Sequence, residues 1–132
     1  MESQPKLDIL INCAGVIFAG DLDNTFPQDH DYLMDVNLRA PFVLTNFFQD
    51  MLIPAQGCVV NMSCLKGSKP QPGLISYCMS KAGLEMLTKS TALELARFGV
   101  RVNCVSSSHL NTNLHRAANL TDQQCESILN KE

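Results

Sequence analysis

Short apolar runs alternate with longer segments of helical periodicity along the chain. The runs at residues 7–11, 58–63 and 100–105 read LDILI, CVVNMS and VRVNCV, and valine and isoleucine are frequent in them. Runs of this length, ended by glycine or polar residues, are typical of buried β-strands. Between them, residues 29–51 and 76–98 place apolar side chains at helical spacing. The sequence therefore predicts the element order strand, helix, strand, helix, strand.

The two predicted helices differ in regularity. The segment 76–98 has alanine-rich filling between its leucines and is followed by Gly99, a residue that commonly ends helices. The segment 29–51 contains Pro41, which cannot donate a backbone hydrogen bond and is expected to kink or loosen the helix. Short strands that alternate with long helices indicate right-handed βαβ crossovers, so we expect an α/β fold with a parallel sheet.

Charge and composition restrict the possible partners and the setting of the protein. The chain has 132 residues, enough for one domain, and a formal net charge of -3. An acidic chain lacks the basic face that nucleic acids and anionic membranes require, so we expect no nucleic-acid or membrane partner. The six cysteines form no CxxC pair and lie mostly within apolar runs, which favours free thiols and a reducing, cytoplasmic setting. No histidine has partners at metal-ligand spacing, so no metal site is expected.

One pair of residues at the start of the second helix has possible catalytic chemistry. Tyr77 and Lys81 are four positions apart in the stretch LISYCMSKAG, which places both side chains on one helical face. A lysine ammonium near a phenol is expected to lower the pKa of the tyrosine, and such a phenol can act as a general acid or base. The preceding loop leaves the carboxyl edge of the sheet, where ligands bind in open α/β folds. The pair alone is a weak motif, because tyrosine and lysine often share a solvated helical face.

The order of several motifs makes the assignment more specific. INCAG follows the first strand, DVNLRAPF lies in the first helix, VVNMSC forms the second strand, and YCMSKAG and VRVNCV follow. In this order the chain resembles the short-chain dehydrogenase/reductase family over about residues 6–114. The resemblance implies a partial Rossmann-like three-layer fold and an NAD- or NADP-dependent oxidoreductase that acts on a small-molecule alcohol or carbonyl substrate.

The resemblance also implies roles for individual residues. Tyr77 is expected to exchange a proton with the substrate oxygen, while Lys81 lowers the pKa of Tyr77 and holds the nicotinamide ribose. Asn37 matches the asparagine that supports a water in the proton relay of the family. The remaining residues expected to contact the cofactor are Asn12, Ala14, Gly15, Leu110 and Thr112.

The chain departs from the family pattern at the position of the catalytic serine. Counting along the second strand, the matching residue is Cys64, and Ser63 lies one position too early. Neighbouring side chains of a strand point to opposite faces, so Ser63 could substitute only if the strand end slipped or bulged. A thiol is a weak hydrogen-bond donor, and the loss of one such hydrogen bond is expected to slow the reaction on the order of a hundredfold.

A larger departure concerns the cofactor-binding half of the family fold. No glycine-rich turn precedes residue 7, although such a turn normally binds the pyrophosphate. We therefore expect residues 1–132 to form a single truncated domain, with residues 106–132 as a remnant of the substrate loop. The first strand should then expose an unpaired edge. We expect the isolated chain to show weak or no turnover with NAD(P)H.

Two other interpretations compete with the oxidoreductase. In the first, the chain is a non-catalytic isoform or remnant that acts as an interaction module. In the family, the helices at 29–51 and 76–98 pair across a dimer interface, so the resemblance implies a homo-oligomer through these segments. In the second, the cysteines serve a small redox protein, which fits poorly because no two cysteines have redox-motif spacing.

Overall fold

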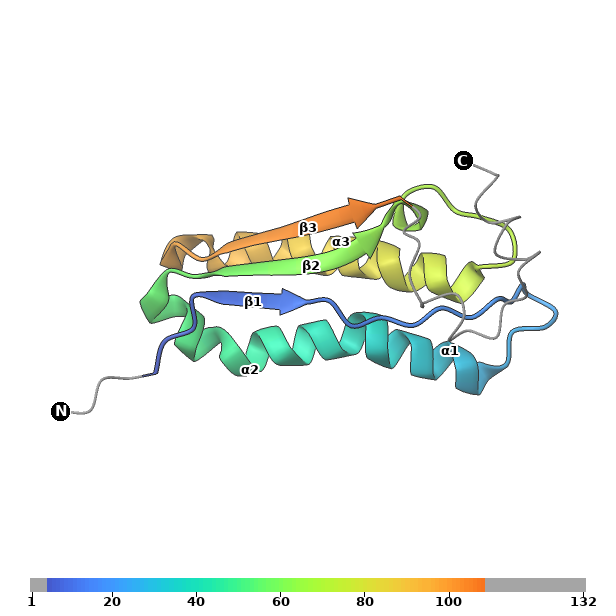
Figure 1. Ribbon diagram of the computed structural model, residues 1–132, viewed down its shortest axis with the longest axis horizontal. Helices are drawn as coiled ribbons and strands as arrows, with labels where there is room; N and C mark the ends of the chain where they lie inside the picture. The colour runs from blue at the N-terminus through green and yellow to red at the C-terminus, as the bar shows by residue number, and fades with distance from the viewer. Residues whose placement is uncertain (1–4, 109–132) are drawn as a thin grey trace.

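A computed structural model of the protein describes residues 5–108 and contains a parallel sheet of three strands. The strands are β1 (Ile9–Asn12), β2 (Cys58–Cys64) and β3 (Arg101–Ser107), in the spatial order β1-β2-β3. Both strand pairs are parallel, and long helices connect consecutive strands (Figure 1). The predicted α/β class and the predicted parallel sheet are confirmed.

The first connection is one long helical run with a change of geometry in the middle. It consists of α1 (Pro27–Met34), the π-helical turn η1 (Asp35–Arg39) and α2 (Ala40–Ala55). The run begins two residues before the predicted segment and ends four residues after it. Pro41 lies in the first turn of α2, directly after η1, so the predicted loosening takes the form of a wider turn. Such a turn suits this position because proline has no N–H for the usual helical hydrogen bond.

The second connection contains the helix that was predicted at residues 76–98. The helix α3 spans Ile75–Leu95 and is extended by the short 3₁₀ turn η3 (Ala96–Phe98). Gly99 ends it with a left-handed φ of 74°. A further 3₁₀ turn, η2 (Leu65–Gly67), follows β2 and begins the loop that leads to α3.

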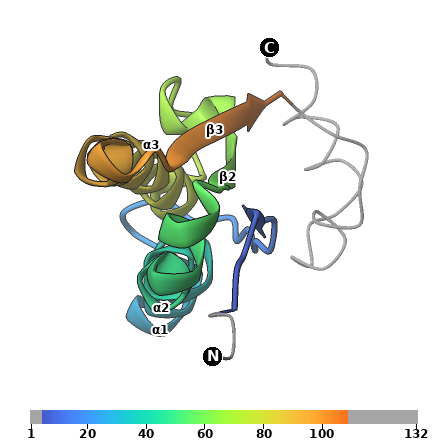
Figure 2. The same cartoon turned by 90° about the vertical axis from the view of Figure 1, so that its left-hand side faces the viewer.

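The helices of the described residues cover one face of the sheet (Figure 2). Leu10, Val59 and Val102 are paired across the three strands and pack beneath α2 and α3. On the opposite face, Ile9 and Ile11 are 57% and 59% exposed. The expectation that the first strand is buried is therefore wrong for one of its two faces. The described part of the chain shows a helical layer on one face only.

Two clusters of buried side chains form the core. One lies under the amino-terminal half of the sheet and contains Leu52, Val59, Leu95, Val100 and Val102. The other lies beyond the carboxyl ends of the strands and contains Ile17, Leu33, Leu74, Tyr77 and Cys78. Tyr77 is thus a core residue of the second cluster.

Backbone hydrogen bonds join the loop after β1 to the start of α3. The Gly20 amide donates to the Gly73 carbonyl at 2.8 Å, and the Ile75 amide donates to the Gly20 carbonyl at 3.2 Å. Gly73 has a φ of 80°, a conformation that glycine adopts without strain. These bonds fix the place where α3 begins, which is also the place where the candidate catalytic residues lie.

Candidate active site

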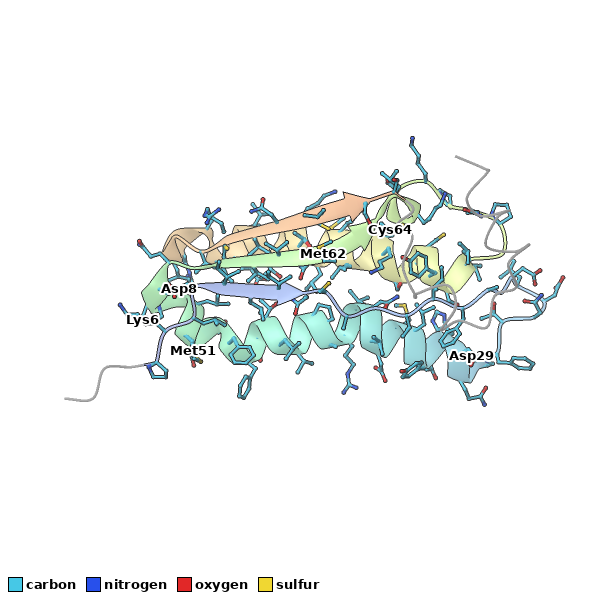
Figure 3. The ribbon with its side chains drawn as sticks, in the orientation of Figure 1. Lys6, Asp8, Asp29, Met51, Met62 and Cys64 are labelled. Carbon is cyan, nitrogen blue, oxygen red and sulfur yellow. The ribbon has the colours of Figure 1, made fainter. Side chains whose placement is uncertain are left out.

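Tyr77 and Lys81 share one buried face in the first two turns of α3. Each side chain is only 5% exposed. The Lys81 Nζ lies 5.7 Å from the centroid of the Tyr77 ring, and it donates a hydrogen bond to the Met62 carbonyl at 2.9 Å. Figure 3 shows that Met62 and Cys64 lie toward the carboxyl end of β2. The phenol and the ammonium are therefore held together at the carboxyl side of the sheet.

Asn37 joins the loop after β1 to α3. Its Oδ1 accepts a hydrogen bond from the Val16 amide at 2.8 Å, and its Nδ2 donates to the Val16 carbonyl at 2.8 Å. The same Nδ2 lies 3.1 Å from the Ser80 Oγ, and the Ser80 hydroxyl donates to the Tyr77 carbonyl at 2.8 Å. Asn37 is only 1% exposed, so these bonds are shielded from water. The π-helical turn η1 places this amide between the loop and the helix.

The loop after β1 approaches these groups closely at Gly15. A β-carbon at Gly15 would lie 3.4 Å from the Asn37 Oδ1 and 3.6 Å from the Lys81 Nζ. The neighbouring Ala14 is exposed. The structure therefore brings Gly15, Asn37 and Lys81 together.

Asn12 is placed differently from its neighbours in the predicted cofactor loop. Its side chain is 6% exposed, and its Nδ2 donates to the Asn61 Oδ1 at 2.8 Å. The Asn61 Nδ2 in turn donates to the Thr88 Oγ1 on α3 at 2.9 Å. The Oδ1 of Asn12 has no hydrogen-bond partner among the described residues. Asn12 thus joins β1 to β2 through its side chain and retains one buried acceptor.

Cys64 and Ser63 point to opposite sides of β2. The Ser63 hydroxyl is buried toward α3, where it donates to the Glu85 Oε1 at 3.3 Å and lies 3.4 Å from the Lys81 carbonyl. Cys64 packs against the cluster that contains Tyr77, and it lies near enough to the phenol to raise its pKa. The pairing of β2 with β3 continues without a bulge from Cys58 to Cys64. The strand end is therefore regular, and the thiol rather than the serine hydroxyl lies beside the phenol.

Burial controls the ionisation of both candidate catalytic groups. Removal from water raises the pKa of Tyr77 above its ordinary value, and the neighbouring Cys64 and Cys78 raise it further. Removal from water lowers the pKa of Lys81, while Cys64, Cys104 and Cys13 partly oppose that change. The expected lowering of the Tyr77 pKa by Lys81 is not observed. Burial of the phenol is the largest cause of the shift, and Lys81, whose Nζ lies over the ring and donates to a backbone carbonyl, is not among its causes.

Other polar contacts near the site were not predicted from the sequence. His30 Nδ1 on α1 lies 2.8 Å from the Oγ of Ser76, the residue before Tyr77. The Glu85 Oε1 also accepts a hydrogen bond from the Ser106 hydroxyl at 2.9 Å. A serine directly before the tyrosine was the only available signal in the sequence, and its partner lies 46 residues away. Leu110 and Thr112, the other residues expected to contact the cofactor, lie outside the described residues.

Two other kinds of site are not found in residues 5–108. No group of three or more histidine, cysteine, aspartate or glutamate side chains could hold a metal ion there. Within the same residues, no helix is long and apolar enough to cross a membrane.

Comparisons with known proteins assign this arrangement to a family. Residues 1–123 match the family described as short chain dehydrogenase. The 3-oxoacyl-[acyl-carrier-protein] reductase FabG of Rickettsia felis is 34% identical over 132 residues, which cover 99% of this chain and 54% of the reductase. The chain belongs to the short-chain dehydrogenase/reductase family, and it spans about half the length of the curated relatives it matches.

Solved structures give the same result for the fold. A gluconate 5-dehydrogenase from Burkholderia cenocepacia, in complex with NADP and tartrate, has a TM-score of 0.83 and 28% identity, over 92% of this chain and 48% of that one. A short-chain dehydrogenase/reductase of unknown function from Caenorhabditis elegans, solved with cofactor, also has a TM-score of 0.83, with 31% identity over 95% of this chain and 48% of that one. The fold of the described residues is therefore Rossmann-like.

Proposed function

We propose that the chain carries the nicotinamide-side half of an NAD(P)-dependent oxidoreductase for an alcohol or carbonyl substrate. The observation that supports this most directly is the buried pair of Tyr77 and Lys81 at the carboxyl side of a parallel sheet. Ligands of open α/β folds bind at that side. The similarity to a 3-oxoacyl reductase and to a gluconate dehydrogenase is consistent with a small-molecule substrate.

We propose that the described residues hold the nicotinamide end of the cofactor. A β-carbon at Gly15 would lie in van der Waals contact with the Asn37 Oδ1 and the Lys81 Nζ, so the loop backbone passes directly beside both groups. Lys81 would hold the ribose, and Gly15 and Ala14 would line the space beside it. Asn12 is proposed as a contact through its free Oδ1. When bound, the nicotinamide supplies or accepts the hydride.

The chain's own residues would move the proton. The Tyr77 hydroxyl would give a proton to the substrate oxygen during reduction and take it back during oxidation. Burial raises the pKa of this hydroxyl, so it stays protonated in this chain but gives up its proton less readily than an ordinary phenol. Asn37 uses both amide hydrogens and one side of its Oδ1 on Val16 and Ser80, so a relay water would bind to the remaining acceptor position.

Cys64 would take the position of the family serine. Its side chain packs against the cluster that contains Tyr77, which supports a place for it beside the substrate oxygen. A thiol donates weakly, and it would stabilise negative charge on that oxygen less than a hydroxyl does. We therefore propose that this chain is a slow catalyst even when its cofactor is bound.

We also propose that residues 1–132 belong to one domain of this family, with residues 106–132 in its substrate loop. Cofactor affinity in this fold is spread over two halves. The purified chain should therefore consume no measurable NADPH with a carbonyl substrate. Robust NADPH-dependent reduction of a carbonyl substrate by the purified 132-residue chain would contradict this expectation.

Calorimetric titration with NADPH tests the proposed binding function. Weak binding in the millimolar range is expected, and it should be lost in Lys81→Met, which removes the ammonium and keeps most of the side-chain volume. Lys89→Met is a matched control because Lys89 is exposed on the same helix. Binding that survives Lys81→Met would contradict the proposed role of Lys81.

The second candidate function is an interaction module that forms a homo-oligomer through α2 and α3. The outer sides of these helices expose large apolar side chains among the described residues. Phe42 and Phe47 on α2 are 54% and 72% exposed, and Met86 and Leu93 on α3 are 60% and 81% exposed. An absence of nucleotide binding together with co-purification of a longer relative would favour this function over the oxidoreductase.

The proposed setting is the cytoplasm. The cysteines of the described residues, Cys13, Cys58, Cys64, Cys78 and Cys104, are all free thiols. Free thiols persist in reducing compartments. Detection of the tagged protein in a fraction other than the cytosol would contradict this proposal.

A further inference from the structure

A hydrogen bond between α1 and α3 lies directly beside Tyr77. The His30 Nδ1 is 2.8 Å from the Ser76 Oγ. Ser76 is 6% exposed and His30 is half-buried, so water has limited access to the contact. No other hydrogen bond recorded in the structure joins a side chain of α1 to the first turn of α3.

The position of Ser76 gives this contact influence over the candidate catalytic pair. Ser76 and Ser80 are four residues apart and lie on one face of α3. Ser76 contacts His30, and Ser80 contacts Asn37. Tyr77 and Lys81 follow the two serines by one residue each. The two serine contacts therefore hold α3 on the side that adjoins Tyr77 and Lys81.

A small pocket lies beside this contact. His30 and Ser76 line a small cavity of about 20 Å³, enough for about one water molecule. The other lining residues are Phe18, Ala19, Gly20, Asn24, Thr25, Asp29 and Leu33. The space beside Ser76 is therefore not completely filled, and the hydrogen bond to His30 is the polar contact that holds its side chain.

We propose that His30 is a positioning residue that acts through Ser76 to direct the Tyr77 hydroxyl toward Cys64. The functional meaning of this role rests on the proposed catalytic function of Tyr77. The contact itself can be tested without cofactor or substrate. Absence of turnover would therefore count against the proposed catalytic function but not against the His30–Ser76 contact. Failure of the contact test would count against the role of His30 but not against the catalytic function.

The test follows the ionisation of Tyr77 optically. The chain has 2 tyrosines and no tryptophan, so Tyr32→Phe leaves Tyr77 as the only tyrosine. In that background, phenolate absorbance is recorded within milliseconds of a jump to pH 11, before the fold is lost. The background protein should show little rapid ionisation. His30→Ala should let Tyr77 turn toward solvent and raise the rapid phenolate-to-phenol ratio by about tenfold, equal to about one pKa unit.

Three further variants separate positioning from general loss of stability. His30→Asn keeps a hydrogen-bonding group near the position of Nδ1 and should restore the slow ionisation of the background. Thr88→Ala removes buried hydrogen bonds on the same helix, eleven residues beyond Tyr77, and should leave the rapid ionisation unchanged. Ser76→Ala should match His30→Ala, and the double variant should add little to either.

A tenfold rise in His30→Ala and in Ser76→Ala, with rescue by His30→Asn, supports the proposal. Unchanged rapid ionisation in His30→Ala would overturn it, as would an equal rise in Thr88→Ala. If His30→Ala does not fold, the same comparison is made with Ser76→Ala and His30→Asn.

Discussion

Burial shifts the pKa values of Tyr77 and Lys81 in opposite directions, because it disfavours the charged form of each. The pKa of Tyr77 is raised in the folded chain, so the folded state holds the phenol proton more tightly than the unfolded state does. The resulting stabilisation is complete below about pH 10, the ordinary value, and is lost as the pH rises through the folded value. The pKa of Lys81 is lowered, so its effect on stability has the opposite sign with rising pH. Replacing only Tyr77 or only Lys81 separates their two contributions to the pH dependence of stability.

The first prediction concerns alkaline stability. Above about pH 10 the contribution of Tyr77 to the free energy of unfolding should fall by up to about 1.4 kcal/mol per pH unit. Tyr77→Phe should remove this decline, and urea unfolding between pH 9 and about 11.5 measures it. Tyr32→Phe is the control because Tyr32 is 54% exposed on α1. An equal decline in Tyr77→Phe and in the parent protein would contradict the burial argument.

The second prediction concerns the amide of Asn37. Asn37→Ala should lower the free energy of unfolding by about 2–4 kcal/mol, because it leaves the Val16 amide and carbonyl and the Ser80 hydroxyl without their partner. Asn46→Ala is the control, since Asn46 is exposed on the helical run that continues from η1. A loss no greater than that of the control would show that the bonds to Asn37 do not hold the loop.

The sequence predicted the alternation at the end of β2 correctly, and the reason is local. Adjacent strand side chains must face opposite sides, so the separation of Cys64 and Ser63 follows from strand geometry alone. The direction of the Tyr77 pKa shift could not be predicted from local geometry. It depends on how many atoms from distant segments surround the hydroxyl, and the spacing of Tyr77 and Lys81 contains no such information.

Among the elements, α3 is held against the site by a very close approach of η2. A β-carbon at Gly67 would lie 2.9 Å from the Lys81 carbonyl carbon and 3.1 Å from the Ala82 amide nitrogen. These are backbone atoms, which cannot rotate away. The glycine therefore allows the turn after β2 to pack directly on the second turn of α3.

The third prediction tests this contact. Gly67→Ala should push η2 away from α3 and lower the free energy of unfolding by about 1–3 kcal/mol. Lys69→Ala, at an exposed position two residues later, should change it by less than about 0.5 kcal/mol. Thermal or urea unfolding measures both. Equal stability of the two variants would mean that α3 can move without cost.

The sequence located the elements well where periodicity was strong. The helix α3 begins and ends within a few residues of the predicted segment because its apolar pattern and Gly99 are local signals. The π-helical turn η1 was not specified in advance, although Pro41 indicated a disturbance. A proline shows where a helical hydrogen bond is missing, but the shape of the adjustment depends on what Asn37 contacts.

On the scale of the whole molecule, the two faces of the sheet differ. Parallel sheets usually bury both faces, yet the face that contains Ile9 and Ile11 is exposed among the described residues. The sequence could not show this, because an apolar strand has the same composition whether one or both faces are covered. The apolar outer sides of α2 and α3 form a separate exposed surface.

The fourth prediction concerns that helical surface. Phe47→Glu places a charge at a position that is 72% exposed, so it should leave folding intact and weaken self-association by at least about tenfold if α2 forms the interface. Sedimentation over a concentration series measures this. Ser68→Glu adds the same charge in an exposed loop and should have no effect. An unchanged dissociation constant in Phe47→Glu would exclude this part of α2 from the interface.

Residue-resolved titration with reduced nicotinamide mononucleotide tests the central claim most directly, since this ligand contains only the part of the cofactor that the described residues are proposed to hold. In amide NMR spectra, the shifts should centre on Gly15, Asn37, Tyr77 and Lys81, and Lys81→Met should abolish them. Adenosine monophosphate should leave the same signals unmoved. Shifts centred elsewhere on the chain, or the same shifts in Lys81→Met, would contradict the account.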